Sequence, residues 1–413
     1  MRRKMFYAVI ALAAAVVLVT GCGNKSAAGG KQVTITFWDG NWNEETFPRL
    51  QQMWNEKYPD IKLVGEYQID QGMFDKYMLS MQNGTAPDVV ACALDWVTTL
   101  GNAGLLAPLD SYIAADSVDT SRYVPGAIKA STIGGKLYGL PFRSETYGLF
   151  YNVDLLRAAG YSEAPKTWDE TVAAARAATK GDAAGYGVCG TNFGNFSFQY
   201  ITMLRSSGGS ILTPDNSKSA LDSPVAIQTA ELYRRLADYA PASMLENDNI
   251  ANRTLFASGK VAMYMSGIYD VPEIQKANPN LNYACAMVPT ANGATRKTIL
   301  GGWSVAIPES SKNKDAAWKF VEFITSPEVA AIYSNTFTGT GAPAERFAGY
   351  DRSIVQPHAD ALQYAEALPA VGPIVGIRQA IFNNLQLALS DTETPRAAIL
   401  KASDAVNKLL SEN

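Results

Sequence analysis

The sequence predicts an α/β protein made of two lobes, each a mostly parallel sheet flanked by helices. Between residues 33 and 91, short apolar runs alternate with amphipathic segments, and this βαβαβ order is typical of a parallel sheet covered on both faces. The stretch K-L-Y-G-L-P-F-R-S-E-T-Y-G-L-F-Y-N (136–152) contains two apolar extended runs, with the polar residues Arg143 to Thr146 between them. Such a break indicates that the chain passes from one lobe to the other beside a solvated cleft.

The opening elements follow from hydrophobic periodicity. The first strand is expected at 33–38, and it runs into a loop rich in Asp, Asn, Gly and Trp. Phe47, Leu50 and Trp54 then fall on one helical face, and the helix should stop near the Tyr58-Pro59 pair. The same reasoning predicts a strand, a helix and a strand at 61–64, 73–81 and 89–91.

Capping signals mark the helices that follow the polar break. After Asn152 the pattern changes to a helix that ends at Gly160, which suits the position just past a helix C-terminus. Thr167 and Glu170 have capping-box spacing at the start of the next helix.

Further elements are expected along the rest of the chain. They are a long helix capped by Asp222 or Ser223, a strand at 261–265, a strand with an internal double glycine at 299–307, a helix around 317–324, a helix after Ser326, a loop over 336–343, and two closing helices at about 374–389 and 395–410. The strand at 299–307 is the candidate for a second passage between the lobes.

Five short motifs, in their order and spacing, resemble the bacterial extracellular solute-binding proteins that serve sugar-importing ABC transporters, the maltodextrin-binding-like group. These motifs are G-T-A-P-D-V-V (84–90), A-G-L-L-A-P-L-D (103–110), G-K-L-Y-G-L-P (135–141), Y-N-V-D-L-L (151–156) and P-K-T-W-D-E (165–170). The resemblance implies a type II-like periplasmic-binding-protein fold whose lobes are joined by hinge crossovers. It also implies discontinuous lobes, with 32–144 plus 303–350 in the N-terminal lobe and 145–302 plus 351–413 in the C-terminal lobe.

The N-terminus has the pattern of a secretory signal. Arg2, Arg3 and Lys4 precede an apolar run over 5–19, which is short for a membrane span, so a signal peptide over 1–21 is favoured over a membrane anchor. The following Cys22 stands where the bacterial lipobox has its lipidated cysteine. This resemblance implies a lipid anchor, a flexible tether over 22–31, and a location outside the cytoplasm on the cell surface or in the periplasm.

Composition indicates a globular protein without a nucleic-acid partner. The chain has 413 residues, of which 47% are hydrophobic and 18% charged, with a net charge of −4. Cys92, Cys189 and Cys285 have no metal-like spacing, and buried free thiols are favoured over a disulfide. No metal site is expected.

Candidate binding residues follow the predicted strands, because ligands of open α/β sheets bind beyond the carboxyl ends of the strands. These residues combine carboxylates, amides and arginine, which bond to hydroxyl groups, with aromatic rings, on which the C–H faces of a sugar pack. The candidates are Asp39, Asn41, Trp42, Asp95, Trp96, Arg143, Glu145, Tyr147, Tyr269, Asp270, Gly302 and Trp303. Trp42, Trp96 and Tyr269 are expected in polar loops facing the cleft, whereas Trp303 is equally suited to core packing.

The family resemblance implies sugar contacts from the positions of Asn41, Trp42, Asp95, Trp96, Glu145, Tyr269 and Arg378. Arg378 enters the set only through the resemblance, and a solvated helix residue is the alternative. Cys92 and Ile374 stand where the maltodextrin group has aromatic residues, which argues against maltodextrin itself. With Arg143, Arg378 could instead bind an acidic sugar or a polyol phosphate such as glycerol 3-phosphate, an alternative to a neutral mono- or oligosaccharide.

The residues favour binding over catalysis. The one histidine, His358, lies in a loop-like Q-P-H-A-D segment and is expected to be a surface group, and the sequence has no nucleophile elbow, zinc motif or phosphate loop. Asp95 and Glu145 could form the carboxylate pair of a glycosidase, and an adhesin or scaffold lipoprotein is a third possibility. We expect a monomer without a cofactor that binds a sugar by hinge closure and delivers it to ABC permease subunits.

Overall fold

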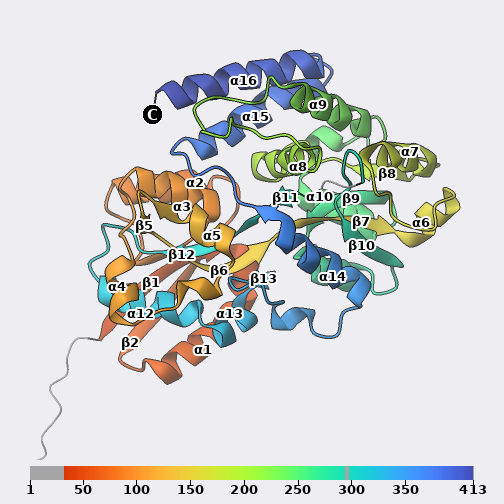
Figure 1. Cartoon of the computed structure of the whole chain (residues 1–413). Coiled ribbons are helices and arrows are strands. Elements are labelled where there is room, and N and C mark those ends of the chain that lie inside the picture. The colour runs from red at the N-terminus through yellow and green to blue at the C-terminus, as the bar shows by residue number, and fades with distance from the viewer. Residues whose placement is uncertain (1–31, 294–296, 413) are drawn as a thin grey trace, which may run out of the picture. The chain divides into compact units, whose positions relative to one another are not determined.

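The computed structural model describes residues 32–293 and 297–412 of the chain. The predicted signal peptide, the lipidation site Cys22 and the tether lie outside the described residues. Within residues 33–412, two main sheets carry most of the strands and helices cover them, as the α/β class predicts (Figure 1).

The larger sheet has six strands in the order β13-β6-β12-β3-β1-β2. Its strands are β1 (Val33–Gly40), β2 (Ile61–Gln68), β3 (Val89–Ala93), β6 (Leu140–Glu145), β12 (Gly301–Ala306) and β13 (Phe337–Thr338). The first three strands pair in parallel, with β1 between β2 and β3, which confirms the predicted βαβαβ opening.

The smaller main sheet has four strands in the order β10-β7-β9-β8. Its strands are β7 (Tyr147–Asn152), β8 (Ala184–Gly187), β9 (Val261–Gly267) and β10 (Tyr283–Met287). Two minor sheets pair β4 (Thr132–Ile133) with β5 (Lys136–Leu137) and β11 (Thr298–Ile299) with β14 (Ala365–Glu366).

The expectation that both sheets are mostly parallel is wrong. In the six-stranded sheet, β12 runs antiparallel to β3 and β6, and β13 runs antiparallel to β6. In the four-stranded sheet, only β8 and β9 are parallel. The chain leaves the larger sheet along β6 and returns along the neighbouring β12, and two adjacent strands used for departure and return must run in opposite directions.

The predicted passage between the sheets lies at Thr146, the single residue between β6 and β7. However, Arg143, Ser144 and Glu145 are not a solvated break, because they form the buried end of β6. Strands β12 and β13 flank β6 and complete its backbone ladder there. The charged side chains of Arg143 and Glu145 are accommodated by pairing with each other rather than by water.

The return to the larger sheet also differs from the expected single strand over 299–307. Ile299 belongs to β11 and pairs with Glu366, whereas β12 begins at Gly301. Gly302 has a φ of +136°, and a β-carbon there would lie 2.9 Å from the Cα of Ser144. The backbone of β12 therefore approaches β6 so closely that only glycine fits. The expected loop at 336–343 contains β13, which pairs with Arg143 and Ser144.

Helices flank both sheets. Those beside the larger sheet are α1 (Phe47–Lys57), α2 (Met73–Gln82), α3 (Leu94–Asn102), α4 (Asp110–Ala115), α5 (Pro125–Ala130), α12 (Lys314–Ile324) and α13 (Pro327–Tyr333). The others are α6 (Val153–Ala158), α7 (Trp168–Ala178), α8 (Phe193–Ser206), α9 (Pro224–Ala237), α10 (Asn249–Ala257), α11 (Asp270–Ala277), α14 (Arg352–Ala361), α15 (Ile374–Leu389) and α16 (Pro395–Ser411). Short 3-10 helices are η1 (Asn41–Thr46), η2 (Thr120–Arg122), η3 (Met244–Glu246), η4 (Glu345–Phe347) and η5 (Leu362–Tyr364).

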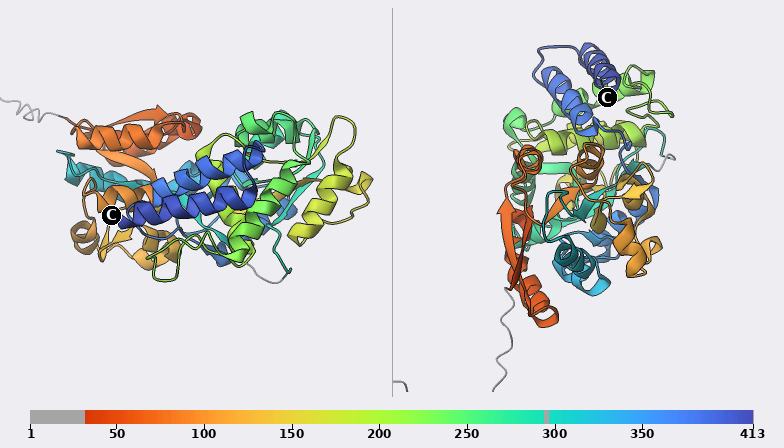
Figure 2. Two further views of the ribbon diagram at one scale, coloured as in Figure 1. Left: turned by 90° about the horizontal axis from the view of Figure 1, so that it is seen from above. Right: turned by 90° about the vertical axis from the view of Figure 1, so that its left-hand side faces the viewer.

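The capping signals around α6 and α7 are confirmed, whereas Ser326, expected to cap α13, stands at its N-cap without a side-chain hydrogen bond. Thr167 and Glu170 form a complete capping box on α7, and Gly160 follows α6 with a φ of +93°. Ser223 rather than Asp222 caps α9, because its hydroxyl accepts from the backbone N–H of Ala226. The two predicted closing helices are α15 and α16, which lie side by side (Figure 2).

Two predictions about isolated reactive residues have opposite outcomes. Cys92, Cys189 and Cys285 are buried free thiols, as expected. The expectation of a surface loop at His358 is wrong, because this residue lies on α14 and is fully buried. Helix α14 continues through Pro357 and packs on β7 and β10, so the proline that suggested a loop does not end the helix.

Candidate ligand-binding cavity

A cavity of about 590 Å³ is lined by residues from the six-stranded side and from the four-stranded side of the fold. The six-stranded side contributes residues of η1, α2, α3, β6 and β12. The other side contributes residues of β7, α8, α10 and α15, together with Tyr269 and Asp270 at the end of β9. The volume is ordinary for a small-molecule site.

All the candidate residues except Asp39 and Asn41 line this cavity. Asn41 is exposed on η1. Asp39 is completely buried, and its carboxylate accepts hydrogen bonds from the N–H of Gly40 (2.7 Å), from Asn43 (2.8 Å) and from the hydroxyl of Tyr333 (2.8 Å). Burial raises the pKa of Asp39. Asp39 therefore holds η1 and α13 against the end of β1.

Aromatic rings form a continuous wall on the six-stranded side. The ring of Trp303 packs edge-on against Trp42 (5.0 Å between centroids) and against Trp96 (5.2 Å). Phe74 extends the wall beyond Trp96. The expectation that Trp42 and Trp96 lie in polar loops is wrong: Trp42 lies on η1, and Trp96 lies on α3 with only 5% of its surface exposed.

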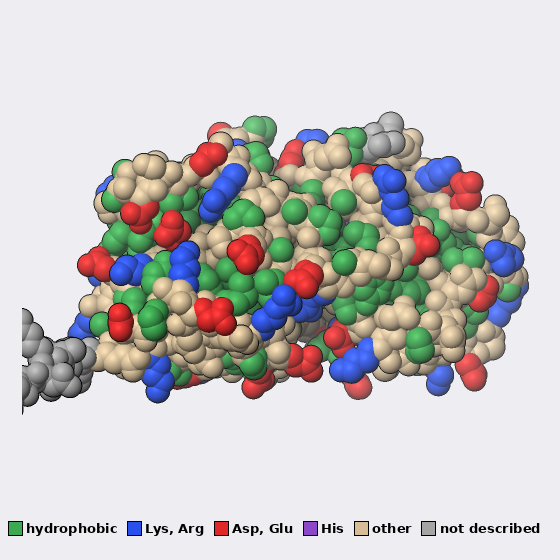
Figure 3. Space-filling model, turned by 90° about the horizontal axis from the view of Figure 1, so that it is seen from below, with side chains coloured by type: hydrophobic (Ala, Val, Ile, Leu, Met, Phe, Trp, Pro, Cys, Tyr) green, Lys and Arg blue, Asp and Glu red, His purple; other side chains and the backbone are tan. Residues whose placement is uncertain are grey.

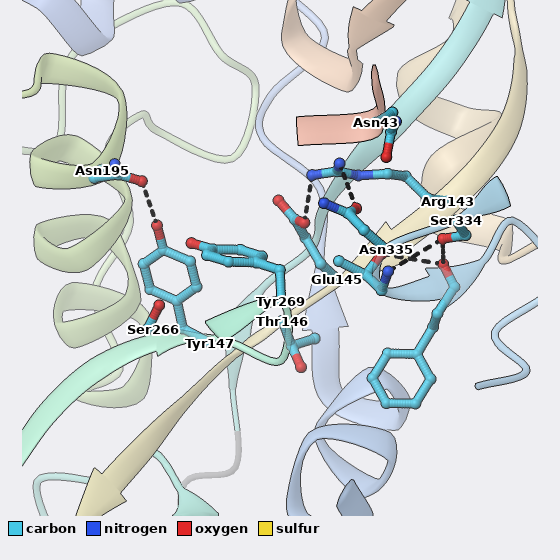
Figure 4. A network of polar contacts seen from close by, with 12 residues as sticks. Asn43, Arg143, Glu145, Thr146, Tyr147, Asn195, Ser266, Tyr269, Ser334 and Asn335 are labelled. Atoms are coloured by element: carbon cyan, nitrogen blue, oxygen red, sulfur yellow. Dashed lines mark hydrogen bonds and ion pairs between the residues drawn. The ribbon is translucent and has the colours of Figure 1, made fainter. Parts of the chain in front are cut away.

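Arg143 and Glu145 form an ion pair at the end of β6 (Figure 4). The Nη2 of Arg143 donates to Glu145 Oε2 at 2.8 Å, and its Nη1 donates to the side-chain carbonyl of Asn335 at 2.7 Å. The guanidinium also lies over the rings of Trp303 and Trp42. Both charged groups are buried, so their mutual pairing compensates for the loss of water.

Arg378 is held by partners from both sides of the cavity. It forms an ion pair with Asp95 of α3, and it donates to the hydroxyl of Ser197 and to the carbonyl of Gly194 on α8. Its guanidinium also stacks 4.5 Å from the ring centroid of Phe198. All three nitrogens of the group are engaged. The alternative of a solvated helix residue is therefore wrong, because Arg378 is only 4% exposed.

On the four-stranded side, tyrosines and amides meet at the cavity (Figure 4). The hydroxyl of Tyr147 donates to the side-chain carbonyl of Asn195 at 3.0 Å. Tyr269 follows the end of β9 and lies half-buried beside Tyr147. Asn249 donates weakly to the hydroxyl of Tyr269 at 3.4 Å. These groups present amide and hydroxyl functions next to aromatic faces.

Asp270 is a buried hydrogen-bond acceptor next to Asn249 and Arg253. Its carboxylate accepts from Ser266 (2.6 Å), Tyr264 (3.0 Å) and Asn249 (3.2 Å), and it forms an ion pair with Arg253 at 3.0 Å. Burial raises the pKa of Asp270, while Arg253 lowers it. Asn249 and Arg253 also line the cavity, so Asp270 orients two groups at the cavity surface.

Sequence reasoning missed several lining residues. Phe193, Asn195 and Phe198 come from the run F-G-N-F-S-F at the start of α8, whose aromatic density is a usable signal. Asn249 and Arg253 lie one helical turn apart on α10, and Asn335 follows α13. Nothing in the local sequence of these three distinguishes them from solvated residues. Among the described residues, no group of acidic, histidine or cysteine side chains could hold a metal ion.

Comparison with known proteins identifies the family. The profile of the bacterial extracellular solute-binding proteins matches residues 39–331. The chain belongs to this family. It is 26% identical to the maltooligosaccharide ABC transporter solute-binding lipoprotein of Streptococcus pneumoniae over 75% of this chain and 74% of that protein. It is 24% identical to a maltodextrin-binding protein of Bacillus subtilis over 99% of this chain and 97% of that protein.

A solved relative confirms the predicted fold. An ABC transporter solute-binding protein from Thermotoga lettingae, bound with α-D-tagatose, superposes with a TM-score of 0.81 and 30% identity, covering 92% of this chain and 100% of that chain. Within the part of the chain that the structure describes, no helix is both long enough and apolar enough to span a bilayer.

Proposed function

We propose that this protein captures a neutral sugar or polyol in the cavity and delivers it to an ABC importer. The observation that carries the proposal is that the aromatic wall of Trp42, Trp96 and Trp303 and the polar groups of Glu145 and Asn195 line one cavity. Aromatic faces accept the C–H face of a sugar ring, and carboxylate and amide groups bond to its hydroxyls.

The charges around the cavity favour a neutral ligand over an acidic sugar or a polyol phosphate. Three arginines line the described cavity, and each is paired: Arg143 with Glu145, Arg253 with Asp270, and Arg378 with Asp95. Asp70 and Asp75 add two more carboxylates to the lining. A phosphate would therefore have to displace an existing carboxylate from an arginine and would meet further negative charge.

Hinge closure is the proposed mechanism of capture. Thr146 connects β6 of the larger sheet to β7 of the smaller one, and Leu300 lies between β11 of a minor sheet and β12 of the larger sheet. We assign 32–144 plus 303–350 to one lobe and 145–302 plus 351–413 to the other. A ligand that contacts Trp42 from one side and Tyr269 from the other binds the closed form more tightly than the open form. Its differential affinity then shifts the population to the closed form.

A thermal-shift experiment tests the ligand class. The purified protein is mixed with D-tagatose, maltose, maltotriose, D-mannitol or glycerol 3-phosphate at millimolar concentration. We expect one of the neutral compounds to raise the melting temperature, because a ligand at about 100 times its Kd adds about 2.7 kcal/mol to stability. A shift with glycerol 3-phosphate alone would contradict the neutral-ligand proposal. Absence of a shift with every compound would contradict sugar or polyol capture for this set.

Binding is proposed to occur without turnover and as a monomer. A neutral compound that binds is incubated with equimolar protein and recovered by chromatography, and we expect it unchanged. Cleaved product in excess of the protein would favour the glycosidase alternative instead. Gel filtration of the same sample, with and without the compound, reports the oligomeric state.

Anchoring through a lipid on Cys22 is the proposed link to the membrane. The proposal rests on the charged, apolar and small-residue pattern that precedes Cys22. In cells, a Cys22→Ser variant should lose lipid labelling and either leave the membrane fraction or accumulate as the precursor. Processing and lipid labelling equal to those of the wild type would contradict the anchor.

A further inference from the structure

Two glycines end strands on opposite sides of the cavity, and each precedes a cavity-lining aromatic residue by two positions. Gly40 is the last residue of β1 and is followed by Trp42. Gly267 is the last residue of β9 and is followed by Tyr269. The sequences D-G-N-W and S-G-I-Y thus place the pattern glycine, any residue, aromatic at the carboxyl end of one strand in each main sheet.

Each ring folds back over its glycine. A β-carbon on Gly40 would lie under 3.0 Å from the Cζ2, Cε2 and Cη2 atoms of Trp42. A β-carbon on Gly267 would lie 2.7 Å from Cδ1 of Tyr269 and closer still to its Cε1. In both cases the atoms are ring atoms of a rigid side chain, so the conflict can be relieved only by moving the ring or the backbone.

Backbone conformation does not explain either glycine. Gly40 has a φ of −75° and a ψ of 148°, values that any residue adopts. Gly267 is not among the glycines of the described chain that have a positive φ. The space occupied by the ring, rather than an unusual dihedral angle, therefore requires glycine at both positions.

A displaced Trp42 would move within the cavity. The ring is bounded by Trp303, 5.0 Å away between centroids, and by the guanidinium of Arg143, 5.8 Å from its centroid. Both neighbours line the same cavity. Tyr269 has an equivalent position beside Tyr147 and Asn249, which also line it.

We propose that Gly40 and Gly267 are positioning residues, which allow the rings of Trp42 and Tyr269 to pack directly against the ends of their strands. The position of the two rings then sets the width of the space between them, here called the ligand slot, and with it the specificity of binding. The proposal rests on the proposed function for its binding consequences, because the slot width matters only if the cavity takes a ligand. Its structural part, the seating of each ring on a glycine, stands independently of the ligand.

The first experiment measures ring position without a ligand. The chain has seven tryptophans, and with 5-fluorotryptophan labelling the fluorine resonance of Trp42 is assigned by its loss in Trp42→Phe. We expect Gly40→Ala to shift this resonance. The matched control is Gly65→Ala in β2, where a β-carbon would lie 2.7 Å from the ring of Phe47, a residue that is not in the cavity lining. An unshifted Trp42 resonance in Gly40→Ala would overturn the seating of that ring.

The second experiment is a double-mutant cycle on thermal stability. Gly40→Ala should lower the melting temperature in the presence of Trp42 and have a much smaller effect in the Trp42→Ala background, because the clash needs the ring. The same relief is expected for Gly267→Ala in a Tyr269→Ala background. Equal losses in both backgrounds would mean that the glycine serves the backbone, and the proposal would fail.

The third experiment measures binding with the neutral compound that gives the largest thermal shift. Gly40→Ala and Gly267→Ala should each weaken binding by about tenfold or more, while Gly65→Ala leaves affinity unchanged. The ratio of affinities for maltotriose and maltose, if both bind, should also change, which a general loss of stability would not produce. If the rings move but affinity and the ratio stay constant, specificity is not set by these glycines. If the wild type binds none of the compounds, the proposed function fails while the resonance and stability results still decide the seating.

Discussion

Asp39 lies near the end of β1 and Asp270 begins α11, three residues after the end of β9, and their buried carboxylates are stabilised in different ways. Both side chains have no exposed surface, and burial raises the pKa of both. Asp39 has no ion-pair partner: its hydrogen bonds come from the uncharged donors of Gly40, Asn43 and Tyr333, and the charge of Arg143 acts on it without contact. Asp270 accepts from uncharged donors and also forms an ion pair with Arg253.

The difference indicates distinct roles for the two sides of the cavity. A carboxylate without a cation can remain buried if several oriented donors replace its water, and such a group serves mainly to fix neighbouring segments. The donors of Asp39 do not line the cavity, whereas Asn249 and Arg253 do. On the six-stranded side Asp39 therefore fixes η1 and α13 behind the cavity lining, whereas on the four-stranded side Asp270 holds two groups that line the cavity itself.

The largest expected effect is the loss of the Asp270 carboxylate. Asp270→Ala should lower the free energy of unfolding by about 3–5 kcal/mol, because it leaves a partly buried guanidinium and three other donors without an acceptor. Asp39→Ala should cost less, about 1–3 kcal/mol, since only uncharged donors lose their partner. Urea unfolding measures both. Equal losses, or a larger loss for Asp39→Ala, would contradict the view that the ion pair makes Asp270 the more important of the two carboxylates for stability.

Ligand affinity gives a second comparison of the two aspartates. Asp270→Asn should weaken binding of the compound found in the thermal-shift panel, because Asn249 and Arg253 lose their orienting charge. Asp39→Asn should leave affinity nearly unchanged. A fall in affinity for Asp39→Asn that matches the fall for Asp270→Asn would show that Asp39 also acts on the cavity and is not only a structural group.

The next expected effect is an acid sensitivity that comes from the four-stranded side. His358 packs on Phe150 of β7, and its Nδ1 lies 3.4 Å from the carbonyl of Thr146. Burial lowers the pKa of His358 to about 4 from an ordinary value of 6.5. Between pH 6.5 and 4, the imidazole of His358 is therefore protonated in the unfolded chain but neutral in the folded protein. This contribution to stability is complete above pH 6.5 and is lost as the pH falls towards 4.

The lost stability should approach about 3 kcal/mol near pH 4, the equivalent of the shift in pKa. Asp39 and Asp270 act in the opposite direction. Burial raises their carboxyl pKa, so protonation at low pH removes the free-energy cost of burying their charge and stabilises the folded protein. The loss should therefore be isolated by comparison with His358→Gln, whose stability should lack the decline between pH 6.5 and 4. The single histidine of the chain also gives one imidazole signal, and titration of that signal near pH 6.5 in the folded protein would contradict the burial argument.

From local patterns, sequence reasoning found the first three parallel strands, nine of the α-helices and ten of the cavity-lining residues, and the family resemblance added Arg378. The capping box of Thr167, the C-terminal glycine after α6 and the polar end of β6 are all visible within a few residues. Strand direction was not visible, since the pairing of β12 with β6 joins segments that are far apart in the sequence. The burial of His358 depends in the same way on the packing of α14 against β7 and β10.

The charged groups show the same limit. Arg143, Glu145, Asp95 and Arg378 were all identified as candidates, and a pairing of Glu145 with Arg143 was one interpretation of that segment, but the pairing of Arg378 with Asp95 was not predicted. The ion pair of Arg378 with Asp95 joins helices α15 and α3, and no local pattern links them. On the outer surface, acidic and basic side chains are interspersed in the view from below (Figure 3). This face therefore shows no large patch of a single charge.

A smaller effect is expected for Glu145, which lies between the two sides. Glu145→Gln keeps the shape of the side chain but removes the charge that faces Arg143 and the cavity. Affinity for the panel compound should fall by about tenfold, or about 1.4 kcal/mol, because hydrogen bonds to a carboxylate are stronger than those to an amide. Lower stability with unchanged affinity in Glu145→Gln would make the carboxylate a structural strut only.

The smallest effect is expected for Asp70, a carboxylate that is exposed. Its Oδ2 accepts from the Nδ2 of Asn192 at 2.9 Å, which joins the loop after β2 to the start of α8 across the cavity. Water competes for such a contact, so Asp70→Ala should change stability by no more than about 0.5 kcal/mol. Asn192→Ala removes the same contact and also the cap of α8, in which its Oδ1 accepts from the N–H of Asn195, so it should cost about 1 kcal/mol. The difference between the two variants then isolates the cap. If Asp70→Ala lowers stability as much as Asn192→Ala, the exposed hydrogen bond contributes more than its competition with water allows. Burial would then not explain why Asp39 and Asp270 are expected to contribute more to stability than the exposed carboxylate Asp70.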